Sequence, residues 1–293
     1  LGDVYKRQLL KEASMKKTIF VLLDACQYEA GTRNLGYLEH LIDYKKGAKY
    51  KVKGELPSLS RPMYATLLTG TPVFSHGITT NDTLRTLDCD NVFSLCQKQG
   101  GKTAAAAYHW FGELYNHIPF RIDRERIQLQ SSETINSGIY YWDDTYPDSH
   151  LFADGEFLRQ NQNPDFLLIH SMAIDDQGHK HGSGSKEYEE AIAIAGHMIA
   201  NLLPTWRAAG YHVVVTADHG INELGIHGGN DCAQRDVPLY IFSDQVSAGR
   251  FENQYISQLC IAPLLCWLLD IEPSPDMMAE IPINMADAIS LIP

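Results

Sequence analysis

Three short β-branched or aliphatic runs that end in polar residues constrain the fold of this chain most strongly. They are residues 18–23 before Asp24, 165–169 before His170 and 212–216 before Asp218. Short apolar runs of this kind are typical of parallel strands that are buried on both faces. In open sheets of such strands, ligands bind beyond the carboxyl ends, where Asp24 and Asp218 would lie. The runs therefore predict a ligand site at one edge of a mostly parallel sheet.

Helical patterns separate these strands along the chain. The clearest covers residues 186–203, with apolar side chains on one face, Ser185 as a plausible N-cap and Pro204 as its end. Residues 237–242 predict a further strand, and residues 255–269 a closing helix. This alternation predicts an α/β fold with a doubly wound, mostly parallel sheet and helices on both faces.

One region breaks the alternation. Residues 111–157 are rich in aromatic and acidic side chains without a clear period, and they predict a small cap insertion over the sheet edge. The length of 293 residues suits one large domain. We expect residues 15–293 to form a single domain and residues 1–14 to be an extension that is disordered or non-native.

Composition narrows the classes of partner and location. With 36 acidic and 24 basic residues the net charge is −12. That charge argues against a nucleic-acid polymer as partner, because such binding depends on many contacts from Lys and Arg to phosphates. A small phosphorylated substrate remains compatible, since a bound cation can override the overall charge.

Apolar runs and cysteines complete these expectations. The longest apolar run, residues 259–269, contains Pro263 and is far shorter than the roughly 20 residues that span a bilayer. We therefore expect no membrane partner. Six scattered cysteines without a CxxC pair predict reduced thiols in a cytoplasmic protein. The oligomeric state is left open.

Ser60 is the candidate nucleophile. Pro62 and Gly70 bracket a short predicted helix, so Ser60 lies at or beside its N-cap and could simply cap it. Alternatively, Ser60 attacks a phosphorus atom that sits at the positive end of the helix. A serine hydroxyl needs a base or a metal ion to react at neutral pH. No Ser-x-x-Lys motif accompanies Ser60, so the activator must come from elsewhere in the chain.

A segment of Asp and His residues offers the first set of possible metal ligands. Asp175 and His179 are four residues apart, so one helical turn or a tight loop would direct both at the same point. Asp176 and His181 compete with them, and a solvated polar loop is the alternative. Gly178 within this spacing suggests a crowded backbone rather than an ordinary helix.

Further possible ligands follow the first and the third predicted strand. Taken alone, an Asp at the position of Asp24 is more often a helix cap or a turn residue than a metal ligand. Asp218 and His219 leave their strand together, and His227 follows in a glycine-flanked loop. Together these residues offer hard carboxylate oxygens and borderline imidazole nitrogens as possible metal ligands.

Taken together, these fragments resemble the alkaline phosphatase superfamily, most closely its nucleotide pyrophosphatase/phosphodiesterase branch. In chain order, that branch has an Asp after the first strand, a Thr or Ser nucleophile before x-Pro, Asp-x-x-Gly-His, Asp-His-Gly and a later His. The resemblance spans residues 18–229. The matching residues are Asp24, Ser60, Asp175, His179, Asp218, His219 and His227.

The resemblance implies a site with two divalent metal ions, expected to be zinc. The first ion would be held by Asp24, Asp218, His219 and the oxygen of Ser60, and the second by Asp175, His179 and His227. The choice of Asp175 over Asp176 follows the spacing of the family. Two such ions would activate Ser60 and stabilise the leaving oxygen, so that a covalent phosphoseryl intermediate forms and is then hydrolysed.

Two further residues enter through the resemblance. The segment 76–81 resembles a His-Gly-Ile segment of the family, which implies that Asn81 donates to a nonbridging phosphoryl oxygen; Asn81 could also be only a turn residue. Arg61 stands where the branch often has an aromatic residue that helps to hold a nucleobase. It could instead bind a second anionic group of the substrate, or face solvent. Tyr64 stands where related sulfatases have Arg, which disfavours sulfatase chemistry.

The resemblance therefore predicts a two-metal phosphoric ester hydrolase of the phosphodiesterase or nucleotide pyrophosphatase type, acting on a small phosphorylated substrate. A phosphomonoesterase or a phosphonate hydrolase with the same metal site is one alternative. A metal-binding protein without catalysis is another, although such a protein has no need for Ser60.

Overall fold

Nine strands form one sheet within residues 15–277 and 280–286, which are the residues that the computed structural model describes. The predicted extension, residues 1–14, lies outside them. The strands are β1 (Lys17–Leu23), β2 (Ala48–Lys53), β3 (Thr103–Tyr108), β4 (Ile127–Gln128), β5 (Ser137–Tyr141), β6 (Phe166–Ser171), β7 (Tyr211–Thr216), β8 (Asp236–Phe242) and β9 (Gly249–Ser257). Their order in the sheet is β4-β5-β3-β6-β1-β7-β8-β2-β9.

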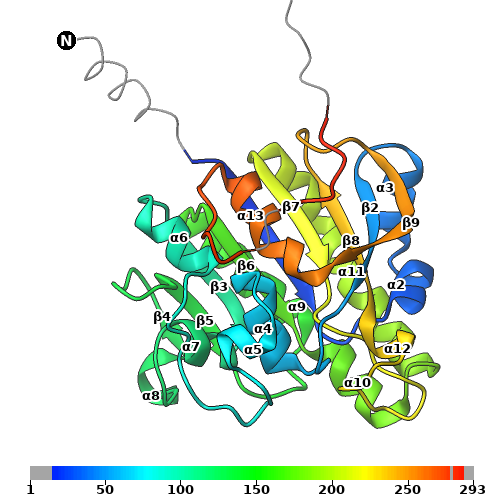
Figure 1. Cartoon of the computed structure of the whole chain (residues 1–293), viewed down its shortest axis with the longest axis horizontal. Helices are drawn as coiled ribbons and strands as arrows, with labels where there is room; N and C mark the ends of the chain where they lie inside the picture. The colour runs from blue at the N-terminus through cyan, green and yellow to red at the C-terminus, as the bar shows by residue number, and fades with distance from the viewer. Residues whose placement is uncertain (1–14, 278–279, 287–293) are drawn as a thin grey trace, which may run out of the picture.

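Short and long helices connect the strands (Figure 1). The helices are α2 (Tyr28–Asn34), α3 (Gly36–Asp43), α4 (Ser60–Thr69), α5 (Val73–His76), α6 (Val92–Lys98), α7 (Trp110–Tyr115), α8 (Ile122–Glu125), α9 (Asp148–Gln162), α10 (Ala173–His181), α11 (Lys186–Ala208), α12 (Cys232–Arg235), the 3-10 helix η1 (Gln258–Cys260) and α13 (Ile261–Leu269). None of the helices in the described part of the chain is both long enough and apolar enough to cross a bilayer.

The predicted α/β fold is confirmed. Strand β1 lies between β6 and β7 and runs parallel to both, with Leu22 in register with His170 and Thr216. Strand β8 is antiparallel to β7 and β2, and β4 is antiparallel to β5, so the sheet is mostly parallel. The carboxyl ends of β1, β6 and β7 therefore lie side by side at one edge.

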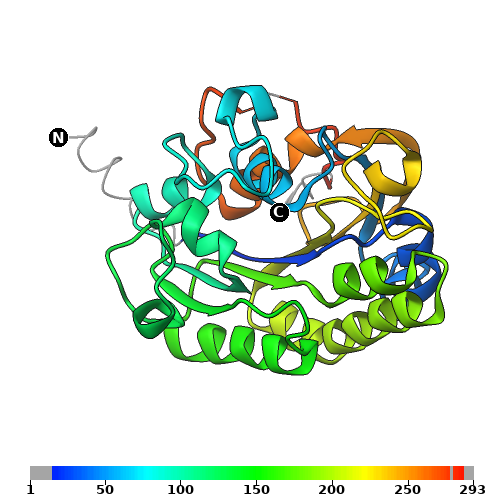
Figure 2. The same cartoon turned by 90° about the horizontal axis from the view of Figure 1, so that it is seen from below.

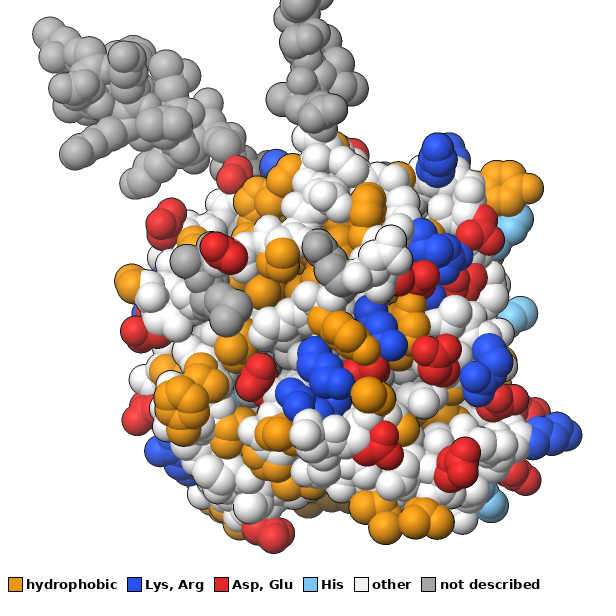
Figure 3. Space-filling model, turned by 45° about the vertical axis from the view of Figure 1, so that its right-hand side comes forward, with side chains coloured by type: hydrophobic (Ala, Val, Ile, Leu, Met, Phe, Trp, Pro, Cys, Tyr) orange, Lys and Arg blue, Asp and Glu red, His pale blue; other side chains and the backbone are white. Residues whose placement is uncertain are grey.

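Helices cover both faces of this sheet (Figure 2). Helices α9 and α11 pack on one face, and α4, α6 and α13 lie on the other. Strand β1 is buried along almost its whole length, as expected for a strand with a helical layer on each side. On the face that Figure 3 displays, Lys and Arg side chains lie among Asp and Glu side chains.

The region predicted as a cap, residues 111–157, contributes two strands to the sheet. It contains β4 and β5, which extend the sheet beyond β3, and Tyr140 and Tyr141 of β5 are buried. Trp142, directly after β5, is 46% exposed. The alternation of strands and helices thus continues through this region, and the antiparallel pair β4 and β5 forms one edge of the sheet.

Two predicted helix boundaries are wrong. Helix α11 continues through Pro204 to Ala208. An internal proline costs about 3 kcal/mol, but the continuation buries Trp206, whose indole N–H donates to Glu156 Oε1 (2.6 Å). The closing helix does not begin at residue 255, because residues up to Ser257 belong to β9, which pairs with β2.

Candidate active site

The candidate ligands and the candidate nucleophile converge at the carboxyl edge of the central strands. Asp24 follows β1, Asp218 and His219 follow β7, and Asp175 and His179 lie on α10, which follows β6. Ser60 is the first residue of α4, and His227 lies in the loop between β7 and α12. Residues that are up to about 200 positions apart in sequence thus meet at one point, as the parallel topology requires.

A first cluster, here called the deep group, consists of Asp24, Ser60, Asp218 and His219. Its centre is His219 Nε2, which lies 3.1 Å from Ser60 Oγ, 3.2 Å from Asp218 Oδ2 and 3.5 Å from Asp24 Oδ1. Ser60 is 4% exposed and the other three residues are fully buried. Ala25 N–H donates to Asp218 Oδ1 (3.2 Å), which leaves Asp218 Oδ2 for His219.

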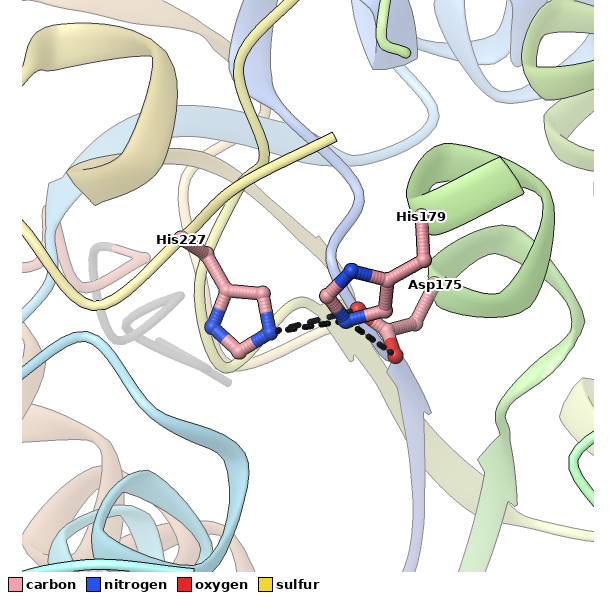
Figure 4. Close-up of side chains that lie close together, drawn as sticks. All are labelled: Asp175, His179 and His227. Atoms are coloured by element: carbon pink, nitrogen blue, oxygen red, sulfur yellow. Dashed lines mark hydrogen bonds and ion pairs between the residues drawn. The ribbon is translucent and has the colours of Figure 1, made fainter. Parts of the chain in front are cut away.

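A second cluster, here called the shallow group, consists of Asp175, His179 and His227 (Figure 4). His179 Nε2 lies 3.1 Å from His227 Nε2 and 3.4 Å from Asp175 Oδ2. Asp175 Oδ1 lies 3.7 Å from His227 Nε2. The side chain of His179 is 47% exposed, so this cluster opens to solvent.

The two clusters adjoin each other. The rings of His219 and His227 stack with their centroids 4.0 Å apart. Asp175, His179 and His227 offer ligand atoms within 4.8 Å of one another, and so do Asp24, Asp175 and His219. Asp175 therefore belongs to both sets, whereas the sequence assigned it to the second ion alone.

Helix α10 explains how Asp175 and His179 come to face the same point. Both lie on one face of this helix, one turn apart. The expectation of a non-helical backbone at Gly178 is wrong, but the expected crowding is present. A Cβ atom at Gly178 would lie 2.9 Å from Ile221 Cγ2 and 3.3 Å from Tyr188 Cδ2, so only glycine lets α10 pack this closely.

The competing ligand candidates on α10 do not reach the histidines. Asp176 turns away from them and forms an ion pair with Lys180 (Nζ to Oδ1, 2.7 Å). His181 is exposed at the end of α10. Neither residue belongs to a set of three potential ligands in the described part of the chain.

Backbone carbonyls orient all three imidazoles. The Nδ1–H groups of His179, His219 and His227 donate to the carbonyl oxygens of Gly225 (2.9 Å), Gly220 (3.0 Å) and Ser58 (3.0 Å), respectively. A histidine whose Nδ1 carries the donated proton keeps the lone pair of Nε2 for a metal ion. The three Nε2 atoms point into the site in the tautomer that a ligand needs.

The carboxylates of the site lack partners that could compensate their charge. Asp24 Oδ1, Asp175 Oδ1 and Asp218 Oδ2 are buried and have no hydrogen-bond partner among the described residues. Burial, and then the neighbouring Asp218, raises the pKa of Asp24 to about 8. Burial also raises the pKa of Asp175 and of Asp218 well above the usual range. Bound cations would compensate the buried negative charge of these carboxylates. The residues therefore fit a site for divalent metal ions.

Two supporting residues were missed by the sequence predictions. The hydroxyl of Tyr64 donates to Asp24 Oδ2, and His170 Nε2 lies 3.1 Å from the same oxygen. Burial lowers the pKa of His170 to about 3, so its imidazole is neutral. Together they leave Asp24 Oδ1 as the oxygen that faces the site. Two sequence features could have indicated these supporting residues. Tyr64 comes one helical turn after Ser60, and His170 lies at a strand end.

The structure separates two roles that the sequence left open for Ser60. Leu59, not Ser60, is the N-cap of α4, and its side chain makes no capping hydrogen bond. Ser60 Oγ contacts His219 instead. Helix α4 ends at Gly70, whose φ of 63° lies in the left-handed region that favours glycine. The capping alternative is wrong, and the role of Ser60 as nucleophile stays a prediction.

Asn81 and Arg61 lie beside Ser60 as well. Asn81 Oδ1 accepts from the backbone N–H of Arg61 (3.0 Å), so the amide of Asn81 reaches the start of α4. Arg61 is 1% exposed, which excludes the solvent-facing alternative. Its guanidinium donates from Nη2 to Glu113 Oε2 (2.7 Å) and lies 4.5 Å above the ring of Trp110.

The ion pair of Arg61 affects the titration of its partner. Burial raises the pKa of Glu113, but hydrogen bonds from His109 and Arg61 outweigh it and bring that pKa to about 2. Arg61 Nε and Nη1 are buried without a partner among the described residues. The predicted contact of Arg61 with a second anionic group of the substrate stays a prediction.

The comparison with known families agrees with this geometry. The model of the family "Type I phosphodiesterase / nucleotide pyrophosphatase" matches residues 18–250. The chain belongs to this family. Membership in the type I phosphodiesterase family confirms the predicted resemblance to the nucleotide pyrophosphatase/phosphodiesterase branch.

Solved structures show the same fold as this phosphodiesterase-family chain. Murine ectonucleotide pyrophosphatase / phosphodiesterase 5 is similar with a TM-score of 0.71 and 12% identity, over 89% of this chain and 96% of that chain. The human protein is similar with a TM-score of 0.70 and 14% identity, over the same shares. At this level of identity, similarity to a solved structure shows the fold alone. The substrate and the activity must be inferred from the residues of the site.

Curated relatives of this family member are transferases. GPI ethanolamine phosphate transferase 2 of Candida glabrata is 25% identical over 194 residues, which are 59% of this chain and 22% of the relative. The catalytic subunit of human GPI ethanolamine phosphate transferase 3 is 29% identical over 161 residues, 52% of this chain and 14% of the relative. The chain spans less than a quarter of the length of either relative.

These relatives overturn one prediction. The expected cytoplasmic location is wrong, because the relatives are GPI ethanolamine phosphate transferases, which are membrane proteins of the endoplasmic reticulum. The inference from the scattered cysteines failed because cysteine spacing indicates only whether a disulfide framework is present. The lack of such a framework does not identify the cellular compartment. The expectations of a small phosphorylated substrate, and of no nucleic-acid or membrane partner, stay predictions.

Proposed function

We propose that this chain is a two-metal phosphoryl-transfer enzyme that acts on phosphodiesters or pyrophosphates through a covalent phosphoseryl intermediate. One observation carries the proposal: Ser60 Oγ lies 3.1 Å from His219 Nε2, within a cluster of buried carboxylates that lack partners. A serine hydroxyl in that position is next to groups that can hold the cation needed to activate it. A metal-binding protein without catalysis would have no use for that hydroxyl.

The deep group would hold one divalent ion and the shallow group the other, with zinc as the expected metal because carboxylate oxygen and imidazole nitrogen suit it. When bound, such ions would polarise the phosphoryl oxygens and lower the pKa of the attacking hydroxyl. Asp175 adjoins both groups and would therefore contribute to both sites.

The residues of the chain itself would perform the transfer. Ser60 Oγ forms a bond to phosphorus while the bond from phosphorus to the leaving oxygen breaks, and the hydroxyl proton of Ser60 passes to solvent. Asn81 anchors its carbonyl on the Arg61 backbone N–H, which leaves its amide NH2 to donate to a nonbridging oxygen. The first N–H groups of α4 add positive potential at the same place. Tyr64 and His170 hold Asp24 in its orientation.

The acceptor in the second step decides between two activities. Attack by water on the phosphoserine regenerates Ser60 and gives a phosphodiesterase or pyrophosphatase. Attack by an alcohol hydroxyl gives a transferase, and this second candidate is favoured by the relatives named GPI ethanolamine phosphate transferases. A phosphomonoesterase or phosphonate hydrolase with the same metals remains the alternative for the donor substrate.

A pair of chromogenic esters tests the proposal. Zinc-loaded protein should release nitrophenol faster from bis-p-nitrophenyl phosphate than from p-nitrophenyl phosphate. The reverse order would favour the monoesterase. No turnover of either ester would support the non-catalytic alternative. Ser60→Ala should abolish turnover and largely keep the zinc content, because the carboxylate and imidazole ligands stay in place. Retained turnover would remove Ser60 as nucleophile.

A product analysis separates hydrolase from transferase. The diester assay is repeated with added glycerol or ethanolamine, and the phosphorylated products are identified by mass spectrometry. A hydrolase gives p-nitrophenyl phosphate alone, whereas a transferase also gives the mixed ester of the added alcohol. Intact-mass measurement after acid quenching should detect the chain with a p-nitrophenylphosphoryl group on Ser60 in the wild type, and no such adduct in Ser60→Ala.

A further inference from the structure

A separate cavity of about 450 Å³ lies between α10, α11 and the segment 144–149. Its wall shares no residue with the deep or the shallow group. The lining side chains belong to Asp144, Thr145, Tyr146, Pro147, Asp148, Ser149, Ala173, Asp176, Gln177, Glu187, Glu190, Ala191 and Ile194. A volume of this size is in the range of small-molecule sites.

The charge of this wall has one sign. Five of the lining residues are Asp or Glu, and none is Lys or Arg. Only Asp176 among them has a strong cationic partner in the described structure, Lys180 at 2.7 Å. Arg126 also contacts the wall, because its Nη2 donates to the hydroxyl of Tyr146 (3.4 Å). A wall of this kind attracts a positively charged ligand.

Asp148 supplies a second observation that points to a ligand. It is only 3% exposed although it lines the cavity, and its Oδ1 accepts from Ser171 Oγ (2.6 Å). Its Oδ2 is buried without any hydrogen-bond partner among the described residues. Burial raises the pKa of Asp148 to about 6, as expected for a carboxylate that lacks a compensating charge.

The arrangement of these carboxylates suits an organic cation better than a metal ion. Among the described residues, no set of three acidic, histidine or cysteine ligands within 4.8 Å includes any residue of this wall. The wall also includes the apolar residues Pro147, Ala191 and Ile194. A dispersed negative wall with apolar patches matches a cation that has a hydrocarbon surface.

We propose that this cavity binds the ammonium group of a small organic amine, with Asp148 and Glu190 as the main anionic contacts. Asp148 carries the buried, unpartnered oxygen Oδ2, and Glu190 is an exposed carboxylate on α11 that also lines the cavity. Ser171 links the cavity wall to the deep group. Its hydroxyl donates to Asp148 Oδ1, and its carbonyl accepts the backbone N–H of Asp24 (2.9 Å). The site is nevertheless distinct from the metal ligands and binds independently of the phosphoryl-transfer activity.

Isothermal titration calorimetry with a matched pair of probes tests this proposal. Choline carries a trimethylammonium group, and dimethylbutanol carries a neutral tert-butyl group of the same shape. Choline should bind the full chain with a stoichiometry near one, and dimethylbutanol should bind at least about 10-fold more weakly. Equal binding of both probes, or no binding of choline, would overturn the proposal. Displacement of choline by stoichiometric magnesium or calcium would also overturn it in favour of a metal site.

Charge-neutralising variants locate the binding. Glu190→Gln should weaken choline binding about 3-fold to 10-fold, and Asp148→Asn, which keeps an oxygen for Ser171, should weaken it more. Glu189→Gln is the matched control, because Glu189 lies on the same helix but pairs with Arg33 outside the cavity. Unchanged affinity in Glu190→Gln and Asp148→Asn, with folding verified by thermal unfolding, would place the binding elsewhere and refute the assignment.

Discussion

The deep and the shallow group differ in how the fold holds them. Asp24, Asp218 and His219 follow directly on β1 and β7, and all three are fully buried. In the shallow group, His179 is 47% exposed, and His227 is held by a loop through the carbonyl of Ser58. Three of the four residues of the deep group thus follow central strands of the sheet, whereas the shallow group depends on the packing of a helix and a loop. The two groups of potential metal ligands are therefore held by different kinds of structural element.

The largest effect is expected from a change in the deep group. His219→Ala removes the atom at its centre and leaves buried carboxylates without their neighbour, so we expect a loss of kcat/KM on the order of 10³-fold or more, together with loss of metal. Steady-state kinetics and metal analysis measure both quantities. If His219→Ala kept wild-type turnover, the deep group would not be the catalytic half of the site.

A change in the shallow group should be more selective. We expect His227→Ala to lower the zinc content from about two ions per chain to about one and to reduce turnover by about 10²-fold, because the deep group stays intact. His181→Ala is the control, since His181 lies on α10 outside both groups. Unchanged zinc stoichiometry in His227→Ala would show that His227 is not a ligand.

Removal of metal should reveal the buried carboxyl groups through the pH dependence of stability. In metal-free protein the pKa of Asp24, about 8, exceeds the unfolded value of 3.8, so the folded state binds more protons and loses stability as the pH rises toward 8. Burial lowers the pKa of His170 and His227 to about 3 from 6.5, so these neutral imidazoles destabilise the fold only below pH 6.5. The window between pH 6.5 and 8 therefore reports on the carboxyl groups.

Thermal unfolding in the presence of a chelator measures this effect. We expect the midpoint to fall by roughly 5 °C between pH 6.5 and 8 in metal-free protein, and to fall much less with zinc bound. Asp24→Asn should reduce the slope in metal-free protein. A slope that is the same in this variant would assign the pH dependence to groups other than Asp24.

The smallest effect should come from the support of the deep group. Tyr64→Phe removes the hydroxyl that donates to Asp24 Oδ2 but keeps the buried ring, which stacks on Phe111. We expect a loss of about 10-fold to 100-fold in metal affinity or turnover, as is usual for partners of metal ligands. Tyr115→Phe is a matched control, because the Tyr115 hydroxyl donates to a backbone carbonyl of α4 instead. Equal losses in both variants would indicate general damage to packing around α4.

The comparison also explains which parts could be predicted from the sequence. The ends of β1 and β7 could be predicted because continuous apolar runs indicate buried parallel strands, and these strands deliver the deep group directly. The assignment of Asp175 and His179 needed their spacing and the family resemblance. Whether a helix or a tight loop supports them was left open, because Gly178 indicates a break until its close packing against Ile221 is known.

Other features depended on tertiary contacts that no local pattern contains. Tyr64 supports Asp24 across 40 positions, and His170 does so across 146. Strand β9 was predicted in part as helix, because its ladder with β2 outweighs local preference. Helix α11 passes Pro204 because Trp206 is buried beyond it. In each case burial or pairing with a distant segment overrode the local signal.

Asp175 links the deep group to the shallow group. Since this single carboxylate adjoins both sets of ligands, a cation bound in either set would favour the deprotonated form of a group that the other set also needs. As free zinc increases, the two ions would therefore bind interdependently, so that occupancy of one set of ligands would change the affinity of the other set.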